Sequence, residues 1–182
     1  MIVIKILLLI LITDLVTGIG HWWEDAYGDP RWKVLGKSVV IPNLDHHKRP
    51  REFLKSSTWE RIRLSFSIAV IIGLAFYFTG LLCWEVIFCL LYGSLANEVH
   101  AISHRTNKEN GKLICAMQKI GLIQSRRMHG HHHTSPYDVN YSIMTNYLNP
   151  FLNKTKFWIG LEYLISLFGI NPMRGSKIRE GL

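Results

Sequence analysis

The sequence is poor in the residues that mark several common classes of protein. It contains three cysteines, and no two of them form a C-x-x-C pair (Cys83, Cys89 and Cys115). A disulfide framework and a cysteine-ligated zinc site are therefore not expected. Cys83 and Cys89 lie in an apolar run, which favours a role as small buried hydrophobic residues. The chain also shows no internal repeat and no low-complexity linker, and we predict a single domain over residues 1–182.

Charged residues are almost missing from two long stretches. Residues 1–16 are apolar except for Lys5, Thr13 and Asp14, and residues 64–96 carry one charge, at Glu85. A single helix over 64–96 would be about 50 Å long, which exceeds a hydrocarbon core of about 30 Å, so we predict two short helices with a turn near Thr79-Gly80. The pattern predicts an all-α integral membrane protein with about three transmembrane helices, including this hairpin. A signal peptide is the alternative for the first stretch, but no A-x-A-like cleavage site follows.

Three further stretches are apolar or aromatic without being long enough to cross a membrane. Residues 113–122 form a short amphipathic stretch, and residues 157–170 are apolar over about fourteen residues, so we predict interfacial helices, or a re-entrant segment for the second. Trp22 and Trp23 are interpreted as part of an interfacial aromatic belt. Residues 29–63 are polar and basic, and the tail from Asn171 is polar and basic as well.

The basic residues lie on one side of the predicted membrane helices. The net charge is +8, and of 21 lysines and arginines only Lys5 precedes the first helix, while the turn near Gly80 has none. A basic surface can bind nucleic acid, but the long apolar runs favour the cytoplasmic face of a membrane protein, so no nucleic-acid partner is expected. One crossing by the first helix and two by residues 64–96 place every histidine group on this cytoplasmic side.

The histidines are concentrated in four groups. Residues 129–133 hold four of the nine histidines, three of them in an H-x-x-H-H pattern (His129, His132 and His133). Neutral imidazole is a common ligand for zinc, iron and copper, although a solvated basic loop can also take up metal adventitiously. His100 and His104 are spaced i, i+4 and share a helix face.

The remaining two histidine groups, His46 with His47 and His21 alone, can bind metal only in particular local structures. His46 and His47 are adjacent, between Pro42 and Pro50, so they lie in a loop or short helix and can bind one centre from its end or contact two centres; an exposed cationic loop is the alternative. His21 shares one face of the first helix with three polar residues (Asp14, Thr17 and Asp25). An ionisable residue in a membrane helix is costly, which suggests function, although Asp14 can also pair with a lysine or arginine in the bundle.

So many imidazoles favour a two-metal site over a single zinc. A catalytic zinc takes three protein ligands, whereas eight or more histidines suit two ions, and imidazole suits iron. Two irons at a membrane face can activate O₂ and remove hydrogen from an alkyl or acyl chain, and the basic face favours an anionic lipid headgroup. A zinc-dependent membrane hydrolase and a non-enzymatic metal-binding membrane protein are the alternatives.

The motifs, taken in order, resemble one known family. They are D-x-x-T-G-x-x-H-W-x-x-D-x-x-G from Asp14, H-H-x-x-P from His46, N-x-V-H-x-x-S-H from Asn97 and H-x-x-H-H-x-x-P from His129, with Tyr147-Leu148-Asn149 similar to a W-L-N step. This ordered set resembles the plasmanylethanolamine desaturase family, which includes Kua/CarF-type proteins and a plant branch acting on phosphatidylglycerol acyl chains. The resemblance covers roughly residues 11–153.

The resemblance implies an O₂-dependent lipid desaturase with a di-iron centre, fed with electrons by an external carrier such as cytochrome b5 or a ferredoxin. It implies that an alkyl-ether phospholipid is converted to a vinyl-ether plasmalogen, with ester-linked acyl chains as the alternative substrate. The same resemblance implies that Asp25 is a ligand or orients a histidine and that Asp14 is a buried partner of a ligating imidazole; His131 has no counterpart in it. The iron ligands implied are His21, His46, His47, His100, His104, His129, His132 and His133.

This sequence departs from the family at two points that bear on the substrate. Where a histidine-aspartate-phenylalanine step is expected, the chain has Arg51-Glu52-Phe53, and Tyr147 replaces the usual tryptophan. These departures leave the ether and ester branches open. The expected location is the endoplasmic reticulum in a eukaryote or the inner membrane in a bacterium.

Overall fold

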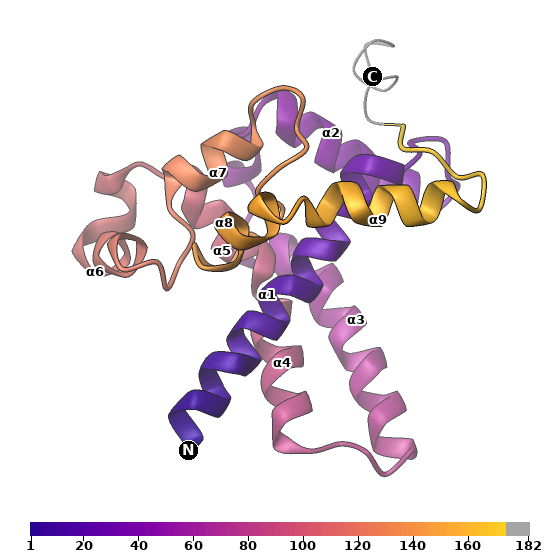
Figure 1. The fold of residues 1–182 in the computed structure, drawn as a ribbon. Helices are drawn as coiled ribbons and strands as arrows, with labels where there is room; N and C mark the ends of the chain where they lie inside the picture. The colour runs from indigo at the N-terminus through magenta and orange to yellow at the C-terminus, as the bar shows by residue number, and fades with distance from the viewer. Residues whose placement is uncertain (174–182) are drawn as a thin grey trace.

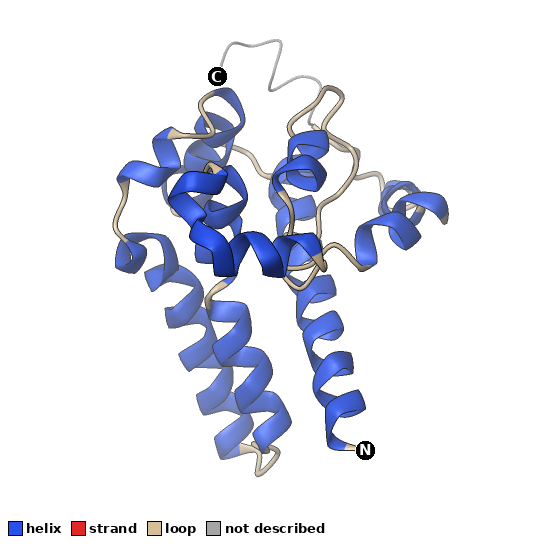
Figure 2. Cartoon of the chain, turned by 90° about the vertical axis from the view of Figure 1, so that its left-hand side faces the viewer, coloured by secondary structure: helices blue, strands red, loops and turns tan. Residues whose placement is uncertain are grey.

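The computed structural model describes residues 1–173, and every regular element in this part of the chain is a helix (Figures 1 and 2). Three long helical rods project from a head built of short helices and loops (Figure 1). The elements are α1 (Ile2–Tyr27), the π-helix η1 (Gly36–Val40), α2 (Ile41–Lys48), the 3-10 helix η2 (Glu52–Lys55), α3 (Thr58–Phe78), α4 (Trp84–Ser94), α5 (Ala96–His104), α6 (Asn107–Lys119), α7 (Arg126–His132), α8 (Leu148–Lys154) and α9 (Phe157–Ser166).

Three helical stretches are long and apolar enough to cross a membrane, as predicted: α1, α3 and the joined α4–α5 stretch Trp84–His104. Few of the side chains in their apolar windows are buried, which suits contact with lipid. Helices α1 and α3 each pack against α4, so α4 is the centre of this layer. The predicted turn is present: α3 ends at Phe78, and Gly80 takes a φ of +70°, which glycine adopts without steric cost.

The two helices of the hairpin extend beyond the apolar residues 64–96 from which they were predicted. Helix α3 begins at Thr58 because Ser57 and Glu60 form a capping box, each side chain accepting the other's backbone N–H. The second helix of the hairpin continues through a mild distortion at Leu95 into α5. The prediction of two short helices is therefore wrong at their outer ends, and His100 and His104 belong to the third long stretch itself.

The shorter elements agree with the sequence in kind. Helix α2 begins at Ile41, includes Pro42 and ends before Pro50, and α9 is a ten-residue helix, too short to span. Helix α6 begins at Asn107, before the predicted amphipathic stretch 113–122, and is interrupted at Gly111. Its N-terminus is fixed by a second capping box, between Thr106 and Glu109. The end of the basic tail, residues 174–182, lies outside the described residues.

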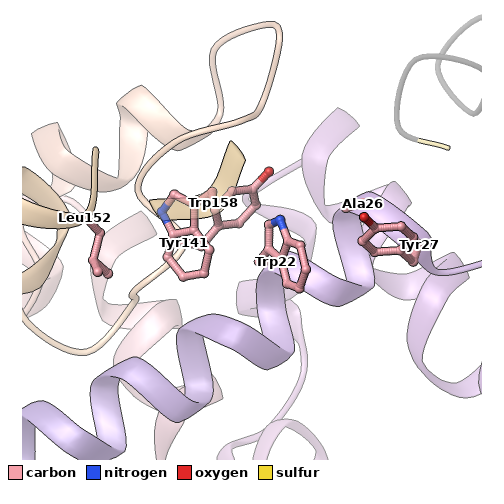
Figure 3. Close-up of a cluster of buried hydrophobic side chains, with 6 residues drawn as sticks. All are labelled: Trp22, Ala26, Tyr27, Tyr141, Leu152 and Trp158. Carbon is pink, nitrogen blue, oxygen red and sulfur yellow. The ribbon is translucent and has the colours of Figure 1, made fainter. Parts of the chain in front are cut away.

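The apolar core of the head includes a residue that we expected at the membrane interface. Trp22 is buried and packs with Tyr141 and Trp158, alongside Ala26, Tyr27 and Leu152 (Figure 3). Its indole N–H donates to Glu162 of α9 at 3.1 Å. The interfacial interpretation is therefore wrong for Trp22, because α9 folds back over this face of α1. Trp23 is half-buried and stacks on Trp32. A buried role is also wrong for Cys83, which is exposed at the start of α4.

An irregular segment, residues 139–147, passes through the middle of the head. Its residues Asn140–Thr145 are all buried although they belong to no helix. Buried backbone groups need partners, and here side chains supply them. The Asn149 amide binds both the N–H and the C=O of Ser142, and Gln124 donates to the same carbonyl. A Cβ atom at Gly18 would lie 3.0 Å from the Ser142 Cα atom, so glycine is required where α1 meets the segment.

Candidate metal centre

Four helices bring the predicted ligands together. Helix α1 supplies His21, the end of α2 supplies the adjacent pair, α5 supplies the i, i+4 pair, and α7 with its C-cap supplies the H-x-x-H-H motif. The side chains form two neighbouring groups. The five-histidine group is His46, His100, His104, His129 and His133; the aspartate group is His21, Asp25, His47 and His132. Together they contain all eight predicted histidines and Asp25.

The ligand atoms of the five-histidine group converge on one point. The His129 Nε2 atom lies 2.8 Å from Nε2 of His100, 2.8 Å from Nε2 of His104 and 3.0 Å from Nε2 of His133. The His104 Nε2 atom lies 3.1 Å from that of His46. Two nitrogens at right angles on one ion, each about 2.1 Å from it, would be about 3 Å apart, which matches these separations.

Hydrogen bonding alone does not account for this convergence. A neutral imidazole nitrogen either donates one hydrogen bond or accepts one, yet the Nε2 atom of His129 has three imidazole nitrogens at 3.0 Å or less. Lone pairs that point at one another repel unless a cation lies between them. The five-histidine group therefore fits a metal ion on its own geometry.

The aspartate group fits a second ion for a different reason. The Nε2 atoms of His21 and His132 are buried without a hydrogen-bond partner, which is costly unless they bind something else. The Asp25 Oδ2 atom lies 3.3 Å from Nε2 of His132 and 3.9 Å from Nε2 of His21. Asp25 Oδ1 lies 3.0 Å from His47 Nε2 and accepts a hydrogen bond from Asn43. Imidazoles with one carboxylate are a donor set suited to non-haem iron.

Backbone carbonyls orient two imidazoles of the aspartate group. The Nδ1 atom of His21 lies 3.2 Å from the carbonyl oxygen of Tyr141, and Nδ1 of His132 lies 2.9 Å from that of Val139. An Nδ1–H that donates to a carbonyl leaves the lone pair on Nε2, the atom that faces the group. The irregular segment 139–147 therefore sets which nitrogen of each ring is available. Sequence patterns gave no indication of this segment's role.

Asp14 lies outside both groups and holds this segment. Its carboxylate accepts the backbone N–H groups of Met144 and Thr145, at 2.9 and 3.0 Å, and the Thr145 hydroxyl at 2.6 Å. Asp14 is fully buried, and these three hydrogen bonds come from backbone and hydroxyl groups, not from an imidazole. It therefore reaches the aspartate group indirectly, through the segment whose carbonyls bind His21 and His132. His131 is exposed and belongs to neither group.

Three imidazoles outside the membrane helices are held neutral, as ligands must be. Burial, followed by the charges of neighbouring imidazoles, lowers the pKa of His46 and of His129 far below the usual value. The same causes lower the pKa of His133 to about 2. A lowered pKa means that the proton is lost well below neutral pH, so these rings present lone pairs under physiological conditions.

A buried ion pair fixes α5 against the start of α3. The Arg61 guanidinium is almost fully buried and donates to Glu98, with its Nε atom at 2.8 Å from Oε2. Arg105 binds the other carboxylate oxygen at 2.7 Å. The Arg61 guanidinium also lies 6.0 Å from the Phe53 ring, which in turn packs against the His46 and His100 rings. None of these supporting residues was identified from the sequence.

A cavity is lined by the membrane helices and by imidazoles of both groups. It has a volume of about 470 Å³, and His21, His46 and His100 form part of its wall. Gly20 also lines it, and a Cβ atom there would meet nothing within 4 Å. Much of the rest of the wall is apolar and comes from α1, α3 and α4, including Ile12, Val16, Leu64, Ile68, Ile72 and Leu90.

Comparison with known proteins identifies the family. A family model described as a lipid desaturase domain matches residues 10–174. A probable fatty acid desaturase of Acanthamoeba polyphaga mimivirus is 32% identical over 93% of this chain and 85% of the viral protein. Chloroplastic fatty acid desaturase 4 of Arabidopsis thaliana is 31% identical over 92% of this chain, and mouse plasmanylethanolamine desaturase 1 is 28% identical over 89%.

The chain covers 53% of the Arabidopsis protein and 64% of the mouse protein. No solved structure matches it. The family match spans the helices that carry both groups of metal-binding side chains and agrees with the resemblance in the ordered histidine motifs. The chain belongs to the lipid desaturase family, whose members are oxidoreductases acting on membrane lipids.

Proposed function

We propose that this chain is a membrane lipid desaturase that uses two irons and O₂ to remove two hydrogens from an alkyl or acyl chain. The observation that carries the proposal is the apolar cavity, whose wall includes imidazoles from both metal-binding groups. A hydrocarbon chain in this cavity would lie beside both ions. We assign the eight histidines of the two groups and Asp25 as iron ligands, within one desaturase domain over residues 1–182.

The reaction balances with an external reductant. The substrate gives up two hydrogens, as two electrons and two protons, and forms a C=C bond. A donor supplies two further electrons, two protons come from solvent, and O₂ leaves as two molecules of water. Bound iron would supply the capacity to reduce O₂ and break an unactivated C–H bond. The donor is proposed to be a carrier of the cytochrome b5 or ferredoxin type.

The residues of the chain position the substrate and set the charge of the site. The apolar side chains of α1, α3 and α4 hold the hydrocarbon and exclude water from it. The Asp25 carboxylate offsets part of the positive charge of the ions, and the carbonyls of Tyr141 and Val139 keep two imidazoles in their ligating orientation. Glu98 and Arg61 hold the helix that carries His100 in place.

The shape of the cavity favours attack near the headgroup end of the chain. The imidazoles lie at its head end, whereas Ile12 and Ile72 lie towards the middle of the membrane helices. Helix α1 rises about 13 Å between Ile12 and His21, so a long apolar tail fits below the imidazoles. We therefore propose that the double bond forms close to the polar end of the lipid, as in a vinyl ether.

An alkyl-ether phospholipid converted to a vinyl ether is the first substrate we propose. Its support is the ordered motif set and the similarity to the mouse protein and to a Myxococcus xanthus protein, both named plasmanylethanolamine desaturase. Ester-linked acyl chains are the second candidate, favoured by the viral and Arabidopsis relatives, which are named fatty acid desaturases. Arg51, where the ether-lipid family has histidine, lies outside both groups.

The distribution of lysines and arginines supports a proposal for the orientation and location of the chain in the membrane. Nine of the 21 lysines and arginines lie between residues 31 and 63, on the head side of the membrane helices. The positive-inside rule then places the head and its histidines in the cytoplasm. The membrane would be the endoplasmic reticulum in a eukaryote and the inner membrane in a bacterium.

Lipid mass spectrometry tests the function directly. The chain is expressed in a host with O₂, a working electron carrier and added alkyl-ether phospholipid, and a His132→Ala/His133→Ala double variant serves as the control. We expect an ether lipid that loses two hydrogens and becomes acid-labile, with the wild-type chain only. Loss of two hydrogens from ester-linked chains instead would select the second substrate class.

Metal content separates the proposal from a zinc hydrolase. We expect about two irons per chain and no activity without O₂. One zinc per chain, activity without O₂ and tolerance of His46→Ala would contradict the proposal, because a single zinc needs three or four of these ligands.

A further inference from the structure

Two of the proposed ligands extend towards the surface of the head. His104 and His133 are partly exposed, whereas the other three members of the five-histidine group are buried. In the aspartate group, the side chain of His47 is 12% exposed. The five-histidine group therefore has more partly exposed ligands than the aspartate group. We call these exposed ligands its edge, which a partner that exchanges electrons with the ions can approach.

Exposed arginines lie near this edge. Arg51 donates from its NH1 atom to the backbone carbonyl of His104 at 3.1 Å. Arg126 begins α7 and shares a helix face with His129 and His133, at spacings of three and seven residues. Its positive charge also acts on the His104 imidazole. Arg127 follows it, and both α7 arginines are exposed. We name Arg51, Arg126 and Arg127 the arginine patch.

The charge of this patch is only partly neutralised. Arg51 forms an ion pair with Glu109, to which it donates a hydrogen bond at 2.9 Å. This hydrogen bond is the largest cause that lowers the pKa of Glu109, to about 2. Glu109 is therefore ionised at neutral pH. Arg126 and Arg127 form no ion pair among the described residues, so they give the patch its net positive charge.

We propose that the arginine patch is the docking site of a small electron-carrier protein with an acidic face, and that electrons enter through the five-histidine group. The inference rests on the proposed function, because desaturation requires two electrons from outside the substrate. Weak electron-transfer encounters use small interfaces, and complementary charge raises their association rate. A small basic patch beside partly exposed ligands meets both requirements.

The position of the patch favours a protein over the lipid surface as its partner. Helices α2 and α7 lie at the end of the molecule opposite the α3–α4 turn, away from the membrane rods (Figure 1). An anionic bilayer would meet the basic residues nearest the membrane helices first. Arg126 and Arg127 are exposed on α7, so a soluble carrier can reach them there.

The experiment compares two reductants on the same iron-loaded enzyme. One is the soluble haem domain of a cytochrome b5, or a ferredoxin, kept reduced by its own reductase; the other is a small mediator reduced by dithionite. The test variant is Arg126→Glu/Arg127→Glu. The control is Lys154→Glu/Lys156→Glu, which makes the same charge change at two exposed residues around the end of α8. Anaerobic reduction of the iron, followed by absorbance, is measured besides lipid turnover.

We expect the α7 variant to slow carrier-driven iron reduction at least about tenfold and to weaken its salt dependence. Reduction by the mediator, iron content and the control variant should stay at wild-type values. Equal carrier kinetics in wild type and variant would overturn the proposal. An equal loss of rate with both reductants would also overturn it, because that result means a structural defect. Weaker binding to anionic vesicles with unchanged carrier kinetics would overturn it as well, because that result means a lipid contact.

Failure of the proposed function gives a different result. In that case the wild-type chain produces no unsaturated lipid with either reductant, although the rate of iron reduction by the carrier can still be compared between variants. The docking inference is thus judged on reduction rates and the proposed function on lipid products.

Discussion

The five-histidine group and the aspartate group are built by different means. In the five-histidine group, each ring comes from α2, α5, α7 or the C-cap of α7, and regular helix spacing brings the nitrogens together. In the aspartate group, two rings are oriented by carbonyls of a buried irregular segment, which a distant carboxylate holds. The first group depends on helix packing, and the second depends on polar contacts that replace secondary structure. The two groups should therefore fail in different ways.

The largest effect is expected from His129→Ala. This change removes the nitrogen on which three other imidazoles converge, so the five-histidine group loses its ion and activity falls by more than about 100-fold. Iron per chain should drop from about two towards one, measured by plasma mass spectrometry, while lipid products are measured in parallel. His131→Ala is the matched control, since this exposed neighbour belongs to neither group. Two irons retained in His129→Ala would refute the assignment.

The next largest effect is expected from Asp14→Asn, which acts on the other group. The carboxylate accepts three hydrogen bonds. An amide of the same shape has an NH₂ group in place of one oxygen, and this group cannot accept a hydrogen bond from the N–H or O–H groups that face it. The segment should loosen, and the aspartate group should lose iron affinity by about 10–100-fold, the range found for residues that orient ligands. Iron titration with a spectroscopic readout for each ion checks this.

Asp45→Asn makes the same chemical change at an exposed residue and should leave both iron sites intact. If Asp14→Asn weakened the five-histidine group instead, the indirect route through the segment would be wrong. Equal loss from both groups would mean general destabilisation, which thermal unfolding would reveal.

The same contrast explains what the sequence could predict. Spacings such as H-x-x-H-H and the i, i+4 pair His100 and His104 report geometry directly, because a helix converts spacing into direction. From the sequence, the adjacent His46 and His47 could bind one centre or contact two. The structure places His46 in the five-histidine group and His47 in the aspartate group. Asp25 joins a group as expected. Hydropathy likewise predicted three membrane helices, since lipid contact depends on composition.

What could not be predicted depends on contacts between residues far apart in the chain. The partners of Asp14 lie 130 residues away, and no local pattern connects them. Trp22 was assigned to the interface because aromatic residues after an apolar run favour it, but α9 covers it. The outer ends of the membrane helices were missed because capping residues, such as Ser57, extend a helix beyond its apolar part.

A moderate effect is expected from filling the cavity without changing either group. In Gly20→Leu the new side chain meets open space in the cavity beside His21, so the fold is retained and the hydrocarbon is displaced. We expect kcat/KM for the lipid to fall about 10-fold or more, in the range by which small shape changes alter a hydrophobic site. Iron content should remain at two.

Gly160→Leu in α9 is the control, because its added side chain also meets open space but lies away from the cavity. Unchanged lipid kinetics in Gly20→Leu would show that the cavity is not where the substrate binds. Loss of iron in the same variant would show that the change reached the metal centre.

The smallest effect is expected at Tyr147, where the family resemblance led us to expect a tryptophan. The Tyr147 hydroxyl donates to the carbonyl of Ile120 at 2.6 Å, and the ring packs near Gly121, far in the chain from any proposed ligand. Because the side chain is 49% exposed, Tyr147→Phe should cost about 1 kcal/mol of stability or less. Tyr147→Trp should leave the ratio of ether to ester products unchanged, measured by lipid mass spectrometry on mixed substrates. A shift in that ratio would mean that the contact between the end of α6 and the start of α8 takes part in substrate choice. It would extend the dependence on long-range polar contacts from the aspartate group to the lipid itself.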